Sequence, residues 1–213
     1  IEVQALGLLG RQRRADDAGG VADDEAQLLG RRVDSRQNEI ALVLAIVIIG
    51  DDNTIRELCT FSRGTIQGGG KTLIGNNNWI MACVHIAHDC ILGDNIIMAN
   101  NTSLAGHVTV GNWAILSGYS LIHQFCSVGE HSFTSFASHV NQSIPPYVTV
   151  SGEKAKARGV NTEGLRRRGF TPEQVQQVRR AYKILYRSGL PLEEATAQLS
   201  EMAATHEEIK PLV

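Results

Sequence analysis

Aliphatic residues recur at every sixth position through the middle of the chain. Ten successive positions share this phase, namely Ile74, Ile80, Ile86, Leu92, Met98, Leu104, Val110, Leu116, Ile122 and Val128. A small or β-branched residue tends to follow four positions later, as at Cys90, Thr102, Val108, Ala114, Ser120, Cys126 and Ser132. Neither the 3.6-residue period of a helix nor the two-residue period of a strand alone produces this pattern. It predicts short strands separated by turns, with the aliphatic side chains pointing inward.

Three six-residue segments would close one triangular coil of 18 residues, and stacked coils would place parallel strands about 4.8 Å apart. We therefore expect a mainly β fold, a parallel β-helix of hexapeptide repeats. The repeat ends near Val150, after which a helical pattern begins. Thr171 is suited to be the N-cap of a helix that has Pro172 in its first turn and Gly189 after its end. A second helix is expected from about Pro191 to Ala204.

The chain accordingly divides into three expected parts. Residues 1–45 lack the repeat, residues 46–150 form the β-helix domain, and residues 151–213 form a small α-helical domain. The flat faces of a β-helix prism pack readily around a threefold axis, so the expected assembly is a homotrimer.

The 18-residue coil also predicts which side chains lie above one another. Ile86, Leu104 and Ile122 should form one column. Four histidines adjoin this column in the sequence, namely His85, His88, His107 and His123. Histidines scattered at random would fall on all sides of the prism, so these mark a single edge, which we expect in the cleft between subunits.

His88, Gly106 and Gln124 share a phase of their own, each 18 residues from the next. Gly106 would leave a notch without a side chain, in which a backbone N–H could stabilise an oxyanion. Asp89 would lie one coil from His107, close enough to orient an imidazole. Because imidazole titrates near neutral pH, a histidine here is suited to be a general base.

Three alternatives compete with that interpretation. The histidines could bind zinc, but Gly106 and Gln124 interrupt the column, and we expect no metal site. The four cysteines, Cys59, Cys83, Cys90 and Cys126, could supply a nucleophile, but no base shares their phase, so they are expected to be small core residues. The polar edge could also have no chemical role.

Composition and charge narrow the expected partners and location. A net charge of −2 gives no reason to expect a nucleic-acid partner, and the apolar run from Ile40 to Ile49 is half the length of a membrane span, so we expect it in the core rather than in a bilayer. The cysteines form no CxxC pair, which favours a cytoplasmic protein.

Residues 153–187 contain ten Lys or Arg and three Glu, a local charge of +7. This basic stretch is either a solvated helix face or a docking surface for an acidic protein.

Several motifs together resemble the UDP-N-acetylglucosamine O-acyltransferase family, which opens lipid A biosynthesis in Gram-negative bacteria. In order along the chain they are GTIQGGG, HIAHDC, ANNTSLAGHV, HQF, PPYV and GVNTEGLRRRGF. The resemblance runs from about Ile49 to the C-terminus and implies a left-handed β-helix. It also implies transfer of a 3-hydroxyacyl group from acyl carrier protein to the 3-hydroxyl of UDP-N-acetylglucosamine, without a cofactor and without an acyl-enzyme.

The resemblance also implies roles for particular residues. His88 matches the general base, Asp89 its supporting acid and Gly106 the oxyanion donor. The positions that hold sugar, nucleotide, phosphates or donor are matched by His85, His107, His123, Gln124, Asn161, Glu163, Arg167 and Arg168. Phe136, which should stack on Gly118, matches the floor of the groove that measures the acyl chain, so a shorter chain than a glycine floor would admit is expected.

The chain departs from the family at both ends. The first 45 or so residues have no counterpart to the family's further coils or to its loop with an Asp and a Lys, which indicates a mis-joined start or a divergent extension. The C-terminus stops short of the family's last helix. A sugar-nucleotide N-acyltransferase and a non-catalytic β-helix protein are the alternative functions.

Overall fold

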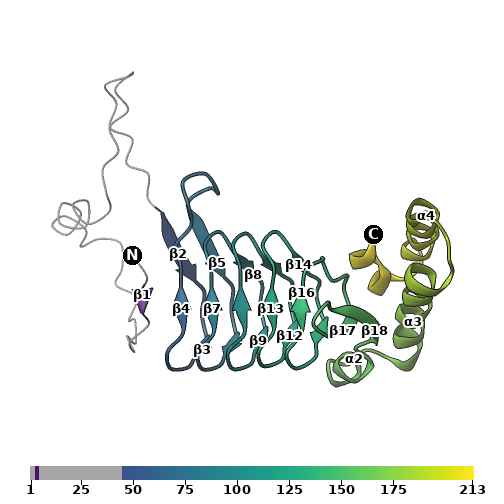
Figure 1. Ribbon diagram of the computed structural model, residues 1–213. Coiled ribbons are helices and arrows are strands. Elements are labelled where there is room, and N and C mark those ends of the chain that lie inside the picture. Colours follow the sequence, from purple (N-terminus) through teal and green to yellow (C-terminus); the bar gives the residue numbers. More distant parts are fainter. Residues whose placement is uncertain (1–2, 5–44) are drawn as a thin grey trace, which may run out of the picture.

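Three parallel β-sheets wind into a prism in the computed structural model, which describes residues 3–4 and 45–213 (Figure 1). Sheet A contains β4 (Thr60–Phe61), β7 (His85–Ile86), β10 (Ser103–Leu104), β13 (Leu121–Ile122) and β16 (His139–Val140), with β1 (Val3–Gln4) antiparallel to β4. Sheet B contains β2 (Ile46–Ile49), β5 (Lys71–Ile74), β8 (Ile91–Leu92), β11 (Thr109–Val110) and β14 (Ser127–Val128). Sheet C contains β3 (Thr54–Ile55), β6 (Trp79–Ile80), β9 (Ile97–Met98), β12 (Ile115–Leu116), β15 (Phe133–Thr134), β17 (Val148–Ser151) and β18 (Lys156–Val160).

The six-residue repeat builds the interior of this prism. The second residue of each repeat strand points inward, and Ile80, Ile86, Met98, Leu104 and Leu116 are completely buried. Each such side chain contributes about 1.5–3 kcal/mol to stability on burial. The small residues four positions later are buried as well, as expected. The predicted parallel β-helix with helices after it is confirmed.

The corners of the prism share an unusual backbone conformation. From the second full coil onward, one residue at each corner has φ near +60°, a region that residues other than glycine seldom occupy. These corner residues lie six positions apart, at Asn77, Cys83, Asp89, Asn95, Asn101, His107, Trp113, Tyr119, Phe125, His131 and Ala137. The corner after sheet A leads to sheet B, the next to sheet C, and the third back to sheet A.

Two features at the start of the β-helix depart from the expected pattern. The loop 62–70 lengthens one coil, so that Thr60 pairs with His85, whereas His85 pairs with Ser103 at the regular 18-residue spacing. The expectation that Ile40 to Ile49 belongs to the core was wrong for Ile48 and Ile49, which are 43% and 42% exposed. Among the described residues, β2 is the end strand of sheet B and pairs with β5 alone.

The C-terminal part begins with strands rather than helices. β17 and β18 pair antiparallel, and the first helix, α2 (Thr162–Arg167), starts only after them, later than the expected change at residue 151. The helices that follow are α3 (Pro172–Arg187), α4 (Leu192–Ala203) and a final 3-10 helix (Glu207–Leu212). Thr171 caps α3 through a capping box, as its sequence predicts.

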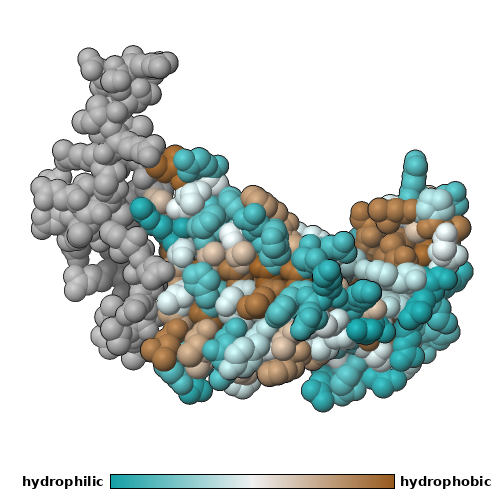
Figure 2. All heavy atoms as spheres, viewed as in Figure 1, coloured by the Kyte–Doolittle hydropathy of each residue, from teal (hydrophilic) through white to brown (hydrophobic). Residues whose placement is uncertain are grey.

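The helices have a core of their own, and its buried members are Tyr147, Leu165, Val175, Val178, Ala181, Leu199 and Ile209. The surface is hollowed between the β-helix and these helices (Figure 2). No helix within the described residues is both long and apolar enough to cross a membrane. The expectations for residues 1–45 concern a segment that lies, apart from Val3, Gln4 and Ala45, outside the described residues.

Candidate active site

The predicted histidine edge exists at the corner between sheets A and B. Strand pairing places Leu104 between Ile86 and Ile122, which confirms the predicted column. His88 and Asp89 follow β7, Gly106 and His107 follow β10, and His123 and Gln124 follow β13. Successive turns of one β-helix therefore bring these side chains to a single line along the prism.

His88 and Asp89 form the central pair of this edge. Nδ1 of His88 lies 2.8 Å from Oδ2 of Asp89. The Asp89 side chain is only 2% exposed, whereas that of His88 is 44% exposed. The Asp89 backbone, at φ 60°, is fixed by its N–H, which donates to the buried hydroxyl of Thr72 over 2.9 Å. One carboxylate is thus held inside the corner while its imidazole partner faces outward.

The surroundings of Asp89 favour its ionised form. Burial raises the pKa of the carboxyl, but hydrogen bonds from Thr65 and His88, with the nearby His107, outweigh this effect and lower the pKa below the ordinary value. An ionised carboxylate can only accept hydrogen bonds. In neutral His88 the proton must therefore be on Nδ1, which leaves the lone pair on Nε2.

Gly106 provides the notch that its phase predicts. A Cβ built on Gly106 would lie 2.5 Å from Cε1 and 2.8 Å from Nε2 of His88, so the imidazole lies directly against the glycine backbone. The Gly106 N–H donates to no other group among the described residues. A free backbone donor beside a basic imidazole nitrogen can stabilise negative charge on an oxygen that forms there.

His107 lies close to His88 and Asp89 but is not hydrogen-bonded to Asp89. Its Nε2 lies 3.7 Å from Oδ2 of Asp89, an ion-pair distance rather than a hydrogen bond. Its ring meets that of His88 edge to face, with centroids 5.2 Å apart, and stacks on Phe125 at 4.7 Å. The sequence suggested that Asp89 orients an imidazole; the imidazole to which it is hydrogen-bonded belongs to His88.

The same groups could also hold a metal ion. His88, Asp89 and His107 offer ligand atoms that all lie within 4.8 Å of one another. Gly106 and Gln124 interrupt the histidine column in the sequence, but Asp89 brings His88 and His107 together in the structure. Asp89 already accepts three hydrogen bonds, which any metal would have to displace in part.

The remaining predicted residues of this edge are nearby but less enclosed. Nδ1 of His85 lies 2.7 Å from the hydroxyl of Thr60 in the preceding coil. His123 and Gln124 are exposed, and Nδ1 of His123 lies 3.1 Å from the Gln124 carbonyl oxygen. They flank the His88 pair and are open to a ligand.

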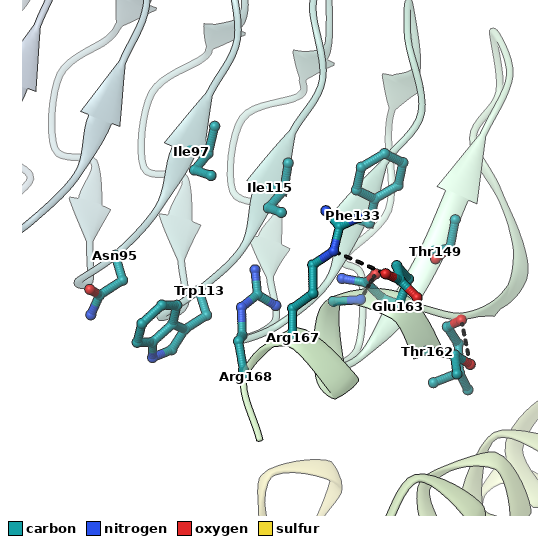
Figure 3. A pocket seen from close by; sticks show the side chains of 13 residues that line it. Asn95, Ile97, Trp113, Ile115, Phe133, Thr149, Thr162, Glu163, Arg167 and Arg168 are labelled. Atoms are coloured by element: carbon teal, nitrogen blue, oxygen red, sulfur yellow. Dashed lines mark hydrogen bonds and ion pairs between the residues drawn. The ribbon is translucent and has the colours of Figure 1, made fainter. Parts of the chain in front are cut away.

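A second group of predicted residues lies at a different corner, between sheets B and C. Asn161, Glu163, Arg167 and Arg168 line a pocket of about 700 Å³, together with outward side chains of sheet C such as Ile97 (Figure 3). Arg167 donates to Glu163 over 3.0 Å, with both side chains exposed. This pocket shares no residue with the histidine edge.

Asn161 supports the wall of this pocket. Its side-chain oxygen accepts from the Gly164 N–H at the start of α2, and its amide donates to the His131 carbonyl over 2.9 Å. The helix end is thereby tied to the β-helix. Within a single chain both ends of this side chain are already hydrogen-bonded.

Two aromatic residues outside the predicted site, Trp113 and His131, hold Arg168. Nη1 of Arg168 lies 3.3 Å from Nδ1 of His131, and the guanidinium carbon is 5.4 Å from the centre of the Trp113 ring. Trp113 and His131 are 18 residues apart and stack, so the phase of the repeat could have identified them. Burial, with the charge of Arg168, lowers the pKa of His131 to about 4, so that its ring is a neutral acceptor.

Phe136 lies at the third corner, between sheets C and A. Its ring is 70% exposed and lies over Gly118, where an added Cβ would meet it at 3.5 Å. Tyr119 packs against it edge to face, with centroids 5.6 Å apart. The predicted stacking on Gly118 is confirmed.

The sequence predicted that all four cysteines are core residues, which is wrong for one of them. Cys59, Cys90 and Cys126 are buried, and burial raises the pKa of the Cys90 thiol to about 11. Cys83 is exposed, because it occupies a corner position with φ 60° rather than an inward one. The buried thiols are poor nucleophiles, since a thiolate is the reactive form.

The coils and the site define a class, that of hexapeptide-repeat transferases. A family model described as "Bacterial transferase hexapeptide (six repeats)" matches residues 71–106, and one described as "Udp N-acetylglucosamine O-acyltransferase; Domain 2" matches residues 144–213. The UDP-N-acetylglucosamine O-acyltransferase structure from Moraxella catarrhalis RH4 is 41% identical, with a TM-score of 0.78 over 83% of this chain and 69% of the other. The chain belongs to the UDP-N-acetylglucosamine O-acyltransferase family.

Other relatives agree. The UDP-N-acetylglucosamine acyltransferase structure from Francisella novicida is 44% identical, with a TM-score of 0.79 over 83% of this chain and 65% of the other. The acyl-[acyl-carrier-protein]--UDP-N-acetylglucosamine O-acyltransferase of Thiobacillus denitrificans is 56% identical over 78% of this chain. The chain spans about three-fifths of the length of the curated relatives that it matches.

Proposed function

We propose that the protein transfers a 3-hydroxyacyl group from acyl carrier protein to the 3-hydroxyl of UDP-N-acetylglucosamine, the first step of lipid A synthesis. The observation that carries this proposal is the arrangement of His88 between buried Asp89 and Gly106. The Nδ1 atom of His88 is engaged by Asp89 at 2.8 Å, and the Nε2 edge lies against the glycine notch. A base and an oxyanion donor thus lie side by side.

The chemistry follows from these positions. Nε2 of His88 accepts the proton of the sugar 3-hydroxyl while that oxygen attacks the thioester carbonyl carbon. The carbonyl oxygen becomes negative and accepts a hydrogen bond from the Gly106 N–H. When the intermediate collapses, the C–S bond breaks and the imidazolium returns its proton to the leaving thiolate. The ionised Asp89 stabilises the imidazolium in between, so no acyl-enzyme is required.

The same proposal includes a homotrimer. The histidine edge and the pocket with Arg167 and Arg168 lie at different corners of one prism, and Phe136 lies at the third. A sugar nucleotide held by both groups would therefore need corners from two subunits. Light scattering or sedimentation should give three times the mass of the chain, and a fully active monomer would contradict this assembly.

We assign donor recognition to the basic surface of α3. Arg179, Arg180, Lys183 and Arg187 line a groove of about 730 Å³, which suits an acidic carrier protein. A cytoplasmic location is proposed with it, because all four cysteines are free, as a reducing compartment would keep them.

One assay tests this function against its rivals. The purified chain is incubated with 3-hydroxyacyl carrier protein and UDP-N-acetylglucosamine, and the product is analysed for O- or N-linked acyl groups. An O-linked product is expected. An N-linked product would indicate the sister reaction, and no product would indicate a non-catalytic protein. Zinc content measured in the same preparation tests the metal alternative: stoichiometric zinc that activity requires would contradict the metal-free mechanism.

A further inference from the structure

The loop 62–70 lies between β4 and β5, and the proposed reaction assigns no role to it. It carries the GTIQGGG motif and interrupts the hexapeptide phase. Thr65 and the turn after it are held together by backbone bonds, since the N–H groups of Gly68 and Gly70 both donate to the Thr65 carbonyl, over 3.1 and 2.7 Å. The loop therefore has a defined shape of its own.

This loop closes over the carboxylate of Asp89. The Thr65 N–H donates to Oδ1 over 2.8 Å, and the Thr65 hydroxyl lies 2.7 Å from Oδ2. Gly68 packs so closely that a Cβ there would come within 2.4 Å of both carboxylate oxygens. Thr65 thus donates to both carboxylate oxygens of Asp89, and Gly68 covers the carboxylate.

The direction of each hydrogen bond is fixed. The Thr65 hydroxyl oxygen accepts from the Gly68 N–H over 3.0 Å, so its own proton is directed to Asp89. Oδ2 then accepts from Thr65 on one side and from Nδ1 of His88 on the other. The Gly68 N–H therefore donates to Thr65, the Thr65 hydroxyl donates to Oδ2 of Asp89, and His88 is the second donor to that oxygen.

We propose that Thr65 is a positioning residue, which holds the Asp89 carboxylate so that Oδ2 faces Nδ1 of His88 and Nε2 keeps the lone pair for the reaction. This role rests on the proposed function only in so far as His88 is the base. The bonds themselves exist independently of the substrate. The hydrogen bonds from Thr65 also contribute to the lowered pKa of Asp89.

Three variants test this role. Thr65→Val keeps the shape and the backbone N–H but removes the hydroxyl, and should lower turnover about tenfold to hundredfold, as expected for the loss of a hydrogen bond to a charged group. Thr65→Ser restores the hydroxyl and should recover most of the turnover. Thr102→Val is the control, because Thr102 is a buried hydroxyl of the same β-helix that donates to the Ser117 carbonyl; its turnover should stay near that of wild type.

A double-mutant comparison separates positioning from simple structural support. In an Asp89→Asn background, Thr65→Val should have little further effect on turnover, because the group through which it acts has changed. A loss as large as in the wild-type background would mean that Thr65 acts by another route and would overturn the proposal.

A second measurement does not depend on activity. Long-range proton–nitrogen spectra report which imidazole nitrogen of His88 carries the proton. Wild type should show the Nδ1–H form, and Thr65→Val a mixture of the two forms. If both proteins show the same tautomer and the same turnover, the positioning role is wrong. If wild type is inactive in the transfer assay but the tautomer still depends on Thr65, the proposed function fails while this inference stands.

Discussion

The imidazole of His88 lies against the backbone of Gly106, so closely that a methyl group on Gly106 would be 2.5 Å from Cε1 of the ring. The two residues are 18 positions apart, which is one coil of the β-helix. Gly106→Ala should therefore push the ring outward as well as narrow the notch. We expect turnover to fall by about two orders of magnitude, in the range of a lost oxyanion donor.

His88→Ala removes the proposed base. Turnover should fall at least about a hundredfold, since general-base catalysis supplies roughly 10²–10⁴. Thermal unfolding should change little, because the side chain is 44% exposed. His139→Ala, an exposed histidine of the same sheet, should keep normal turnover. A His88→Ala enzyme with near-normal turnover would show that another group takes the proton.

His131 should make stability depend on pH below neutrality. Its folded pKa is about 4, below the ordinary histidine value of 6.5, because burial disfavours the charged ring. Between these values the unfolded chain binds more protons, so stability should fall as pH drops from about 6.5 and level off near 4. The loss attributable to this residue is on the order of a few kcal/mol. Denaturant unfolding of wild type and His131→Gln at pH 7 and pH 4.5 measures it; equal pH dependence in both would contradict the assignment.

Phe136 should limit the length of the acyl chain. Phe136→Gly removes the ring above Gly118 and should move the preference toward longer hydroxyacyl donors, by up to about 0.8 kcal/mol for each methylene newly covered. Rates with a series of carrier-protein thioesters measure this shift. Ile91→Ala, an exposed apolar side chain on sheet B, should leave the preference unchanged. An unchanged preference in Phe136→Gly would show that the ring is not the floor.

Binding of acyl carrier protein should weaken as salt rises, because the groove on α3 presents several cations to an acidic partner. Arg180→Ala and Lys183→Ala should weaken binding at low salt and flatten the salt dependence. Arg56→Ala removes a cation at the other end of the prism, where it pairs with Glu57, and serves as control. Affinity that stays constant between low and physiological salt would favour a solvated helix face.

Much of the fold and part of the site could be predicted because the repeat converts sequence distance into spatial distance. With a period of 18, the contact of His88 with Gly106 and that of Phe136 with Gly118 follow from arithmetic. The same arithmetic places Trp113 on His131, a pair that no family motif marks.

Other contacts could not be predicted in this way. The loop 62–70 has no phase, so nothing in the sequence placed Thr65 on Asp89. The pairing of Asp89 with the adjacent His88 depends on a corner at φ 60°, which a count of residues does not reveal. Exposure of Ile48 and Ile49 depends on what covers the end of sheet B, a property of the three-dimensional structure alone.

The positive-φ corners make heat resistance adjustable one residue at a time. A residue other than glycine in this conformation costs on the order of 1–3 kcal/mol, and most corners of the prism carry one. At Asp89 and His107 the side chain belongs to the proposed active site, so a substitution that removes the backbone strain would also remove a reactive group. At Cys83, an exposed corner outside the sites described above, the side chain has no such role. An engineer, or natural selection in a warmer habitat, could place glycine or asparagine at such corners and raise the melting temperature without altering the reactive edge.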